Sequence, residues 1–302
     1  MKNIIPNRVS YAFHCLIKGI PTSRKESADW YLGMTTKQEQ AFYRTCSEQY
    51  KDIKGVIVDL GCWMGSTSFS LAEGLKASAK PTKIYAYDLF RWETWMDQFD
   101  GMTACDYLPG ESFLPEARRR MQKHKDCVEL IQADLLGYQY GRGPIKILLV
   151  DAMKTAALSE SICIRFFTNL QPGGLLIHQD FKHYFTPWIH IIQFRLRKQF
   201  RFTHEVQQSG TVAFELLERI ESSEAEQVAN LEQVSDAEVE EAIQYSLGMV
   251  SNDERSPIAA AHVMHFVHAH RHADAHRLLV SSLRKRLISD EDHKQILKHL
   301  DF

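Results

Sequence analysis

The sequence lacks the net charge and the long apolar runs that mark nucleic-acid-binding and membrane proteins. Its 302 residues include 36 Lys and Arg against 38 Asp and Glu, so the formal net charge at pH 7 is −2. A chain without an overall positive potential has no general attraction for phosphate backbones, and we expect no nucleic-acid partner. No apolar run approaches the roughly 20 residues of a membrane span, so we expect no membrane partner either.

Cysteine is also scarce and unpatterned, which bears on metal sites and on the compartment. The six cysteines include no C-x-x-C pair and no repeated spacing; they stand at positions 15, 46, 62, 105, 127 and 163. This distribution argues against a zinc ribbon and against a disulfide framework. We interpret these residues as reduced thiols of a cytoplasmic protein.

The sequence does contain a regular alternation of short β-rich runs and helix-compatible stretches. The strand candidates are residues 56–60, 83–88, 128–132, 146–150 and 175–178. The helix-compatible stretches between and after them are residues 66–78, 111–125, 158–170 and 186–200. Near-continuous apolar runs of this length suit parallel strands buried on both faces. The alternation therefore predicts an α/β fold with a doubly wound, mostly parallel sheet.

The end of the predicted sheet and the C-terminal region follow different patterns. Two further strand candidates, 202–207 and 211–217, are separated by only three residues, too few for a parallel crossover. We therefore expect a seven-stranded sheet that ends in an antiparallel hairpin. Glutamates are frequent and basic residues almost absent over 218–241, which we interpret as an acidic linker. An all-helical appendage is expected to follow it.

These patterns predict three regions along the chain. Residues 1–50 are expected to form an N-terminal helical cover, 51–218 the sheet domain, and 219–302 the acidic linker with the helical appendage. Short helices with one apolar stripe cannot bury that stripe alone. We therefore expect the appendage to pack on the sheet domain or on a second copy of the chain, through which, or through the N-terminal segment, a homo-oligomer would form.

The most informative segment joins the first predicted strand to the first predicted helix. It reads Val58-Asp-Leu-Gly-Cys-Trp-Met-Gly-Ser-Thr67. Glycines at such a turn allow a ligand to approach the backbone at the carboxyl edge of the sheet. Their spacing is G-x-x-x-G, whereas nicotinamide dehydrogenases use G-x-G-x-x-G. Asp59, which precedes the glycines, would repel a pyrophosphate but suit a ligand that carries an ammonium group.

This segment resembles the first motif of the class I S-adenosyl-L-methionine (SAM)-dependent methyltransferases, which have a Rossmann-like fold. The resemblance implies that Gly61 and Gly65 flank the methionine part of SAM, and that Asp59 supports its amino group. It further implies that Asp88, at the end of the second strand, accepts hydrogen bonds from the ribose hydroxyls, and that Asp134, after the third strand, contacts the adenine. The implied cofactor-binding residues are Asp59, Gly61, Gly65, Ser66, Asp88 and Asp134. The alternative is that the glycines form only a tight turn and the acids are solvated caps.

Polar residues also follow the fourth and fifth predicted strands. Asp151 ends the fourth strand, and Gln179 and Asp180 follow the fifth. Two carboxylates and an amide oxygen form a hard-oxygen set that suits Mg²⁺. The arrangement resembles the metal-dependent small-molecule O-methyltransferases of the catechol type and of the macrocin or mycinose type, and it implies that Asp151, Gln179 and Asp180 are metal ligands. Where the macrocin type has D-G-D, this chain has Asp151-Ala152-Met153, so the second acid is missing.

Two residues are candidates for the catalytic base. Lys154 follows Asp151 by three residues, the spacing at which catechol-type enzymes carry a lysine base. A lysine beside a divalent cation would have a lowered pKa and a neutral amine near neutral pH. His183, on the loop after the fifth strand, is the alternative base in a metal-free enzyme. The alternative without a catalytic role is that Lys154 is a solvated loop residue and Asp180 only caps a turn.

The function predicted from these features is a SAM-dependent O-methyltransferase that acts, with the help of Mg²⁺, on a hydroxyl of a sugar or natural-product small molecule. The long, irregular segment 91–110 is expected to be a lid over this acceptor. One alternative is a metal-independent methyltransferase that acts on nitrogen or a phenol. Another is a degenerate methyltransferase fold that serves as a scaffold, which the missing second acid supports.

Overall fold

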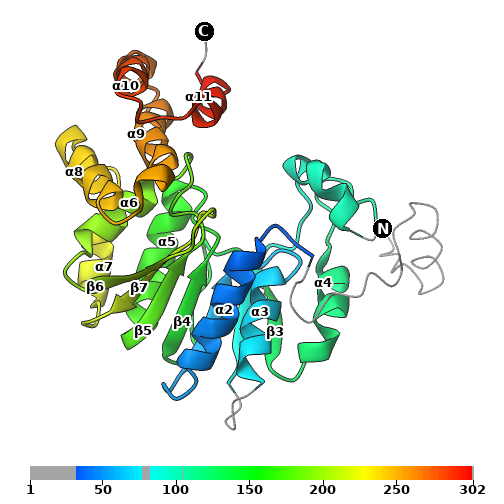
Figure 1. Cartoon of the computed structure of the whole chain (residues 1–302). Coiled ribbons are helices and arrows are strands. Elements are labelled where there is room, and N and C mark those ends of the chain that lie inside the picture. The colour runs from blue at the N-terminus through cyan, green and yellow to red at the C-terminus, as the bar shows by residue number, and fades with distance from the viewer. Residues whose placement is uncertain (1–31, 77–81, 104, 301–302) are drawn as a thin grey trace.

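The computed structural model describes residues 32–76, 82–103 and 105–300 (Figure 1). Most of the predicted N-terminal cover, residues 1–31, lies outside the described residues, as does Cys15. The five described cysteines are all free thiols. Within the described ranges, no helix combines the length and the apolar character needed to cross a bilayer.

The core of the protein is a seven-stranded sheet with the strand order β3-β2-β1-β4-β5-β7-β6. Its strands are β1 (Val56–Leu60), β2 (Ile84–Asp88), β3 (Val128–Gln132), β4 (Ile145–Val150), β5 (Leu170–His178), β6 (Phe200–Glu205) and β7 (Val212–Leu216). β1 to β5 pair in parallel, whereas β7 runs antiparallel to both β5 and β6. This topology confirms the predicted Rossmann-like methyltransferase fold, with its mostly parallel sheet and terminal antiparallel hairpin.

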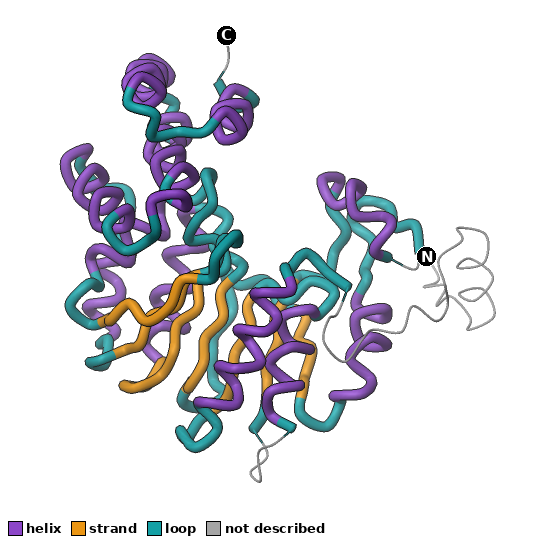
Figure 2. Tube along the Cα trace, in the orientation of Figure 1, coloured by secondary structure: helices purple, strands orange, loops and turns teal. Residues whose placement is uncertain are grey.

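Helices cover both faces of this sheet (Figure 2). One face carries α2 (Lys37–Gln49), α3 (Ser66–Leu75), α4 (Leu114–Arg120) and the short η2 (Met121–His124). The other face carries α5 (Ala156–Phe166), η3 (Phe167–Asn169) and α6 (Pro187–Arg195). Along β4, Ile147 and Leu149 face the first layer, and Leu148 and Val150 face the second. All four are fully or almost fully buried, as parallel strands between two helical layers require.

The first helices of the C-terminal region pack on the sheet domain, and its last helices form a small core of their own. Its elements are α7 (Ser222–Ala229), α8 (Asp236–Leu247), η4 (Asn252–Glu254), α9 (Ser256–His268), α10 (His272–Arg284) and α11 (Asp290–Leu297). Ala225 of α7 and Ile243 of α8 belong to the same buried cluster as the sheet residues. α9, α10 and α11 pack mainly on one another, around Met264 and Leu279, and project beyond the sheet (Figure 1).

The prediction of an acidic linker over 218–241 was wrong for much of its length. Residues 222–229 form α7, in which Ala225 and Ala229 are fully buried. Glu226 of this helix is exposed, Glu224 accepts a hydrogen bond from Gln199, and the alanines pack on α5, so the helix is amphipathic despite its low overall hydropathy. The expected helical appendage is present.

Candidate active site

A cavity of about 670 Å³ opens at the carboxyl edge of the parallel strands. Its size falls within the range of roughly 300–1,000 Å³ typical of small-molecule sites. Eight of the residues that the sequence singled out line it: Gly61, Asp88, Asp134, Asp151, Lys154, Gln179, Asp180 and His183. They come from the ends of β1 to β5, which meet at one edge because these strands run parallel.

Three predicted cofactor residues, Asp59, Gly65 and Ser66, do not line the cavity. Gly65 is the N-cap of α3, with a φ of +93° that favours glycine. Ser66 is buried at the first position of α3 and packs against Gly33, where an added Cβ would lie 2.6 Å from the Ser66 Cβ. Both residues therefore shape the turn rather than the cavity wall.

Gly61 brings the ends of β1 and β4 together. Its φ is +85°, and a Cβ at this position would lie 2.3 Å from the backbone oxygen of Asp151. No side chain fits there, so glycine is required both by the backbone conformation and by the close approach of the second strand. The same approach places Asp151 beside the glycine turn at the cavity wall.

Asp59 is fully buried behind the glycine turn. Its Oδ2 accepts hydrogen bonds from the Thr67 hydroxyl (2.6 Å) and the Ser68 hydroxyl (2.5 Å), both on α3. Its Oδ1 is buried and has no hydrogen-bond partner among the described residues. Burial raises the pKa of the Asp59 carboxyl to about 6, although the two hydroxyls act in the opposite direction. Asp59 Oδ1 is thus a hydrogen-bond acceptor beside the turn that no described residue uses.

This raised pKa predicts a pH-dependent stability. The folded carboxyl keeps its proton up to about pH 6, whereas an unfolded aspartate loses its proton near pH 4, so ionisation disfavours the folded state between these values. We expect the stability of Asp59→Asn, relative to the wild type, to rise by about 2 kcal/mol between pH 4.5 and 7.5. Urea unfolding at the two pH values measures it, and a pH-independent difference contradicts it.

Asp88 and Asp134 stand at the ends of the next two strands. Asp88 is half-buried; its Oδ2 accepts the Trp63 backbone N–H (2.9 Å) and its Oδ1 accepts that of Phe90 (2.7 Å). Burial raises the pKa of the Asp88 carboxyl, and these N–H groups oppose the rise. Asp134 is exposed at the rim, where its Oδ1 accepts the Leu136 N–H (3.0 Å). Both carboxylates retain lone pairs for a ligand.

Lys154 bridges the two acids that follow β4 and β5. Its Nζ lies 2.6 Å from Asp151 Oδ1 and also contacts Asp180 Oδ2. The side chains of the two acids are only 14% and 12% exposed. Burial raises the pKa of the Asp151 carboxyl to about 8, whereas at Asp180 the Lys154 ammonium outweighs burial and lowers the pKa. Desolvation alone would lower the pKa of Lys154, but the carboxylates of Asp151 and Asp180 outweigh it and raise that pKa above its usual value.

The three predicted magnesium ligands are not arranged as a metal site. The ammonium of Lys154 takes the place between Asp151 and Asp180 that the ion was expected to hold. The Gln179 Oε1 accepts a hydrogen bond from the Tyr43 hydroxyl (3.2 Å) on α2. Among the described residues, no group of three or more His, Cys, Asp or Glu side chains is placed to hold a metal ion. The residues present therefore do not fit Mg²⁺, and Lys154 is held as an ammonium, not as the expected neutral amine.

His183 lies on the loop after β5 and is exposed to the cavity. Partial burial lowers the pKa of its imidazole, although Asp180 opposes the shift, so the ring is neutral at neutral pH. Its Nδ1 accepts the Phe185 backbone N–H (3.2 Å). The proton of the neutral ring therefore sits on Nε2, so with this contact formed neither ring nitrogen is free to accept a proton, and His183 is a poor base in this orientation.

Two of the cavity residues, Trp63 and Met34, were not assigned from the sequence. Trp63 lies inside the G-x-x-x-G motif, and Met34 belongs to the segment before α2. Arg91 and Trp95 come from the predicted lid, part of which forms the 3₁₀ helix η1 (Thr94–Met102). Trp95 is 53% exposed, a high fraction for tryptophan, and a partly exposed aromatic side chain in a cavity wall is a signal for ligand contact. Trp92, by contrast, is fully buried and anchors the loop.

Comparison with known proteins gives similar folds and no close relative. No protein-family model matches the chain, and no curated protein matches it. Among solved structures, the O-methyltransferase NovP is 14% identical over 62% of this chain and 83% of its own (TM-score 0.49). The calicheamicin methyltransferase CalS11 is 10% identical over 70% and 94% (0.49), and a Geobacter sulfurreducens methyltransferase is 18% identical over 72% and 91% (0.42). These similarities concern the fold, so the functional conclusion rests on the cavity residues.

Proposed function

We propose that this protein is a SAM-dependent methyltransferase that transfers a methyl group to a hydroxyl of a small molecule, such as a sugar or a natural product. The observation that supports this most is the set of carboxylates around the glycine turn. Asp59 lies one residue before the end of β1, Asp88 ends β2 and Asp134 follows β3, and Gly61 leaves the backbone open beside them. Such a set would repel a phosphate and suits a ligand with an ammonium group and free hydroxyls.

The residues present fit SAM. Asp88 would hold the ribose hydroxyls, Asp134 the adenine, and the turn at Gly61 the methionine part. The unpaired Oδ1 of Asp59 is a buried acceptor whose desolvation is offset when a donor reaches it, directly or through water. When bound, SAM supplies the electrophilic methyl group. The adjoining part of the cavity remains for the acceptor.

The cavity walls support an amphipathic, hydroxylated acceptor. Trp63 and Trp95 offer aromatic faces, and Lys154 and Asp180 offer charge at the carboxyl ends of β4 and β5. Methyl transfer is an in-line displacement, so these residues would orient the hydroxyl and exclude water. The Lys154 ammonium keeps Asp180 ionised, since it outweighs burial and lowers the pKa of that carboxyl. Asp180 is then the group that accepts the hydroxyl proton, and Lys154 stabilises the negative charge that develops on the acceptor oxygen.

Isothermal titration with SAM tests the cofactor part of this proposal. We expect the wild type to bind, and Asp88→Ala to weaken binding at least tenfold because the ribose hydroxyls lose their charged acceptor. Asp126→Asn removes an exposed acid before β3, at the opposite edge of the sheet, and is the matched control. Absence of wild-type binding at hundreds of micromolar SAM rules the proposal out. Binding without transfer to any of a broad panel of hydroxyl and amine acceptors favours a scaffold instead.

The place of Lys154 favours a metal-independent reaction over the magnesium-assisted one. An ammonium between two carboxylates already supplies the positive charge that a divalent cation would bring. We therefore expect the transfer rate to stay within twofold after treatment with EDTA and dialysis. A loss of more than tenfold that added Mg²⁺ restores shows instead that the metal displaces Lys154 during turnover.

A further inference from the structure

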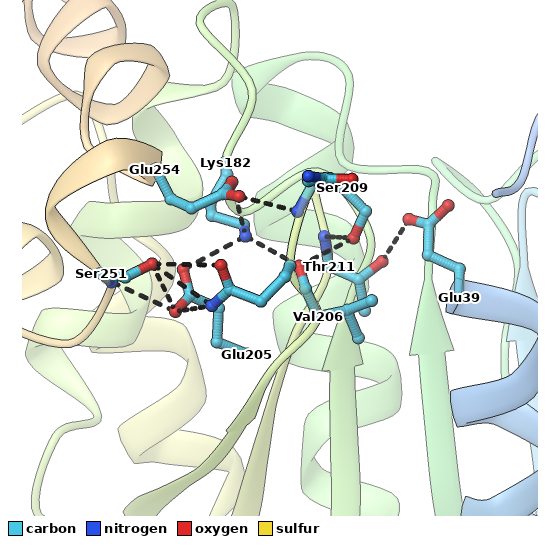
Figure 3. Close-up of polar contacts among 10 residues, drawn as sticks. Glu39, Lys182, Glu205, Val206, Ser209, Thr211, Ser251 and Glu254 are labelled. Atoms are coloured by element: carbon cyan, nitrogen blue, oxygen red, sulfur yellow. Dashed lines mark hydrogen bonds and ion pairs between the residues drawn. The ribbon is translucent and has the colours of Figure 1, made fainter. Parts of the chain in front are cut away.

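A second lysine near the cavity is fully removed from solvent. Lys182 follows Asp180 by two residues in the loop after β5, and its side chain is 1% exposed. Its Nζ lies 3.2 Å from Glu205 Oε1 and 3.0 Å from Glu254 Oε2, and it donates to the Val206 backbone oxygen at 2.9 Å (Figure 3). A buried ammonium is tolerated only with such partners, so its position is closely defined.

The partners of Lys182 come from two other parts of the chain. Glu205 ends β6, and Glu254 ends η4 in the C-terminal region. Each carboxylate has a second contact: Glu254 Oε1 accepts the Gln208 N–H (2.7 Å), and Glu205 Oε2 accepts the N–H (3.1 Å) and hydroxyl (3.0 Å) of Ser251. The β6–β7 hairpin, the η4 segment and the loop after β5 therefore meet at one buried cation (Figure 3).

The same loop is held from its other side by α2. The Tyr43 hydroxyl contacts both the Gln179 Oε1 (3.2 Å) and the Thr211 hydroxyl (3.0 Å). Thr211 in turn donates to Glu39 Oε1 (2.7 Å), as Figure 3 shows. Residues 179–183, which carry three cavity-lining side chains, are thus fixed at their start by Tyr43 and at Lys182 by the two glutamates.

We propose that Lys182 is a positioning residue. Through the ion pair of Lys182 with Glu254, the C-terminal region holds a loop of the active site in place. The pair ties η4 to the loop that presents Asp180 and His183, although neither Lys182 nor Glu254 lines the cavity. A displacement of about 1 Å in a positioning loop is enough to slow a reaction by about 100-fold. The expected change in kcat rests on the proposed methyl transfer, whereas the expected change in amide exchange does not.

The test compares Glu254→Gln with Asp253→Asn. Both remove one negative charge from η4, but Asp253 is exposed, whereas Glu254 faces Lys182. Lys182 keeps Glu205 as a partner in Glu254→Gln, so this variant is expected to fold. We expect its amide exchange over residues 180–186 to be at least tenfold faster, including the Lys182 N–H that donates to the Gly210 oxygen. Asp253→Asn should exchange at the wild-type rate.

The kinetic prediction separates positioning from general stability. In Glu254→Gln, kcat is expected to fall at least tenfold while the Kd for SAM stays within twofold, because the cofactor residues lie on β1 to β3. Wild-type exchange and wild-type kcat together overturn the inference. An equal loss of SAM binding also overturns it, since it indicates general destabilisation. If no acceptor is methylated at all, the proposed function fails. The amide exchange rates over residues 180–186 then test by themselves whether Lys182 and Glu254 hold the loop.

A double variant keeps the inference testable if one variant folds poorly. Lys182→Met leaves two buried carboxylates without their cation and is expected to be the more damaging single change. If Lys182 and Glu254 act through one contact, Lys182→Met with Glu254→Gln is no worse than Lys182→Met alone in loop exchange and kcat. Additive losses mean that the two residues act separately, which overturns the proposed pair.

Discussion

Gly61→Ala is expected to abolish measurable SAM binding and to lower the free energy of unfolding by about 3 kcal/mol. The new Cβ would lie 2.3 Å from the Asp151 backbone oxygen, and the residue would have to keep a φ of +85°. Both opposing groups are backbone, so neither can rotate away, and the ends of β1 and β4 must separate. This separation opens the turn and moves Asp151 at the same time. Chemical denaturation and titration with SAM measure the two effects.

Gly137→Ala is the matched control for this prediction. Gly137 is exposed, on the loop after β3, and no atom lies within 4 Å of an added Cβ. We expect its unfolding free energy and SAM affinity to match those of the wild type. If Gly61→Ala also binds SAM with wild-type affinity, the close approach of the two strands is not needed for the site.

Lys154→Met is expected to lower kcat by about 100-fold or more, with a Kd for SAM within twofold of the wild type. The variant removes the positive charge of Lys154 from the cavity wall, where we propose that it stabilises the acceptor oxygen, and keeps most of the side-chain volume. It leaves Asp151 and Asp180 side by side, 14% and 12% exposed, without their shared cation. Burial already raises the pKa of Asp151 to about 8, and without Lys154 the pKa of Asp180 also rises, so Asp180 is a weaker proton acceptor because it is no longer held ionised. Single-turnover assays separate this loss from changes in binding.

The same variant is expected to acquire an affinity for Mg²⁺ that the wild type lacks. Two freed carboxylates near the amide of Gln179 form the oxygen set that the sequence first indicated. Millimolar Mg²⁺ should therefore raise the melting temperature of Lys154→Met but not that of the wild type. Lys198→Met, which removes an exposed lysine after α6, is the control. An equal Mg²⁺ effect on all three proteins would falsify the view that Lys154 holds the ion's place.

The fold and the position of the site were predictable because they depend on local patterns. Runs such as 147–150, which are apolar at every position, have no polar face, and this indicates parallel strands between two helical layers. Parallel strands then place their carboxyl ends on one edge, and Asp88, Asp134 and Asp151 line one cavity there. Gly61 was recognised from the G-x-x-x-G spacing. In the structure its positive φ and the nearby Asp151 backbone exclude other residues.

The roles of individual side chains were less predictable because they depend on distant partners. The contacts of Asp59 with α3 could not be predicted, because every residue from 57 to 60 is buried and no alternation shows which layer Asp59 faces. Lys182 lies 23 residues from Glu205 and 72 from Glu254, and nothing local marks it as buried. Lys154 was correctly placed beside Asp151, yet its reach to Asp180 depends on how two separate loops meet.

The insertion of β7 between β5 and β6 determines when the site is completed during synthesis. β1 to β5 all leave the ribosome before β7, and until β7 arrives β5 is an open edge strand. Glu254 follows later still, so Lys182 gains its last partner only after most of the chain has been made. The nascent protein thus carries the glycine turn at Gly61 well before it carries a fixed loop after β5. Newly made chains are expected to gain methyl-transfer competence last, after the cofactor half has folded.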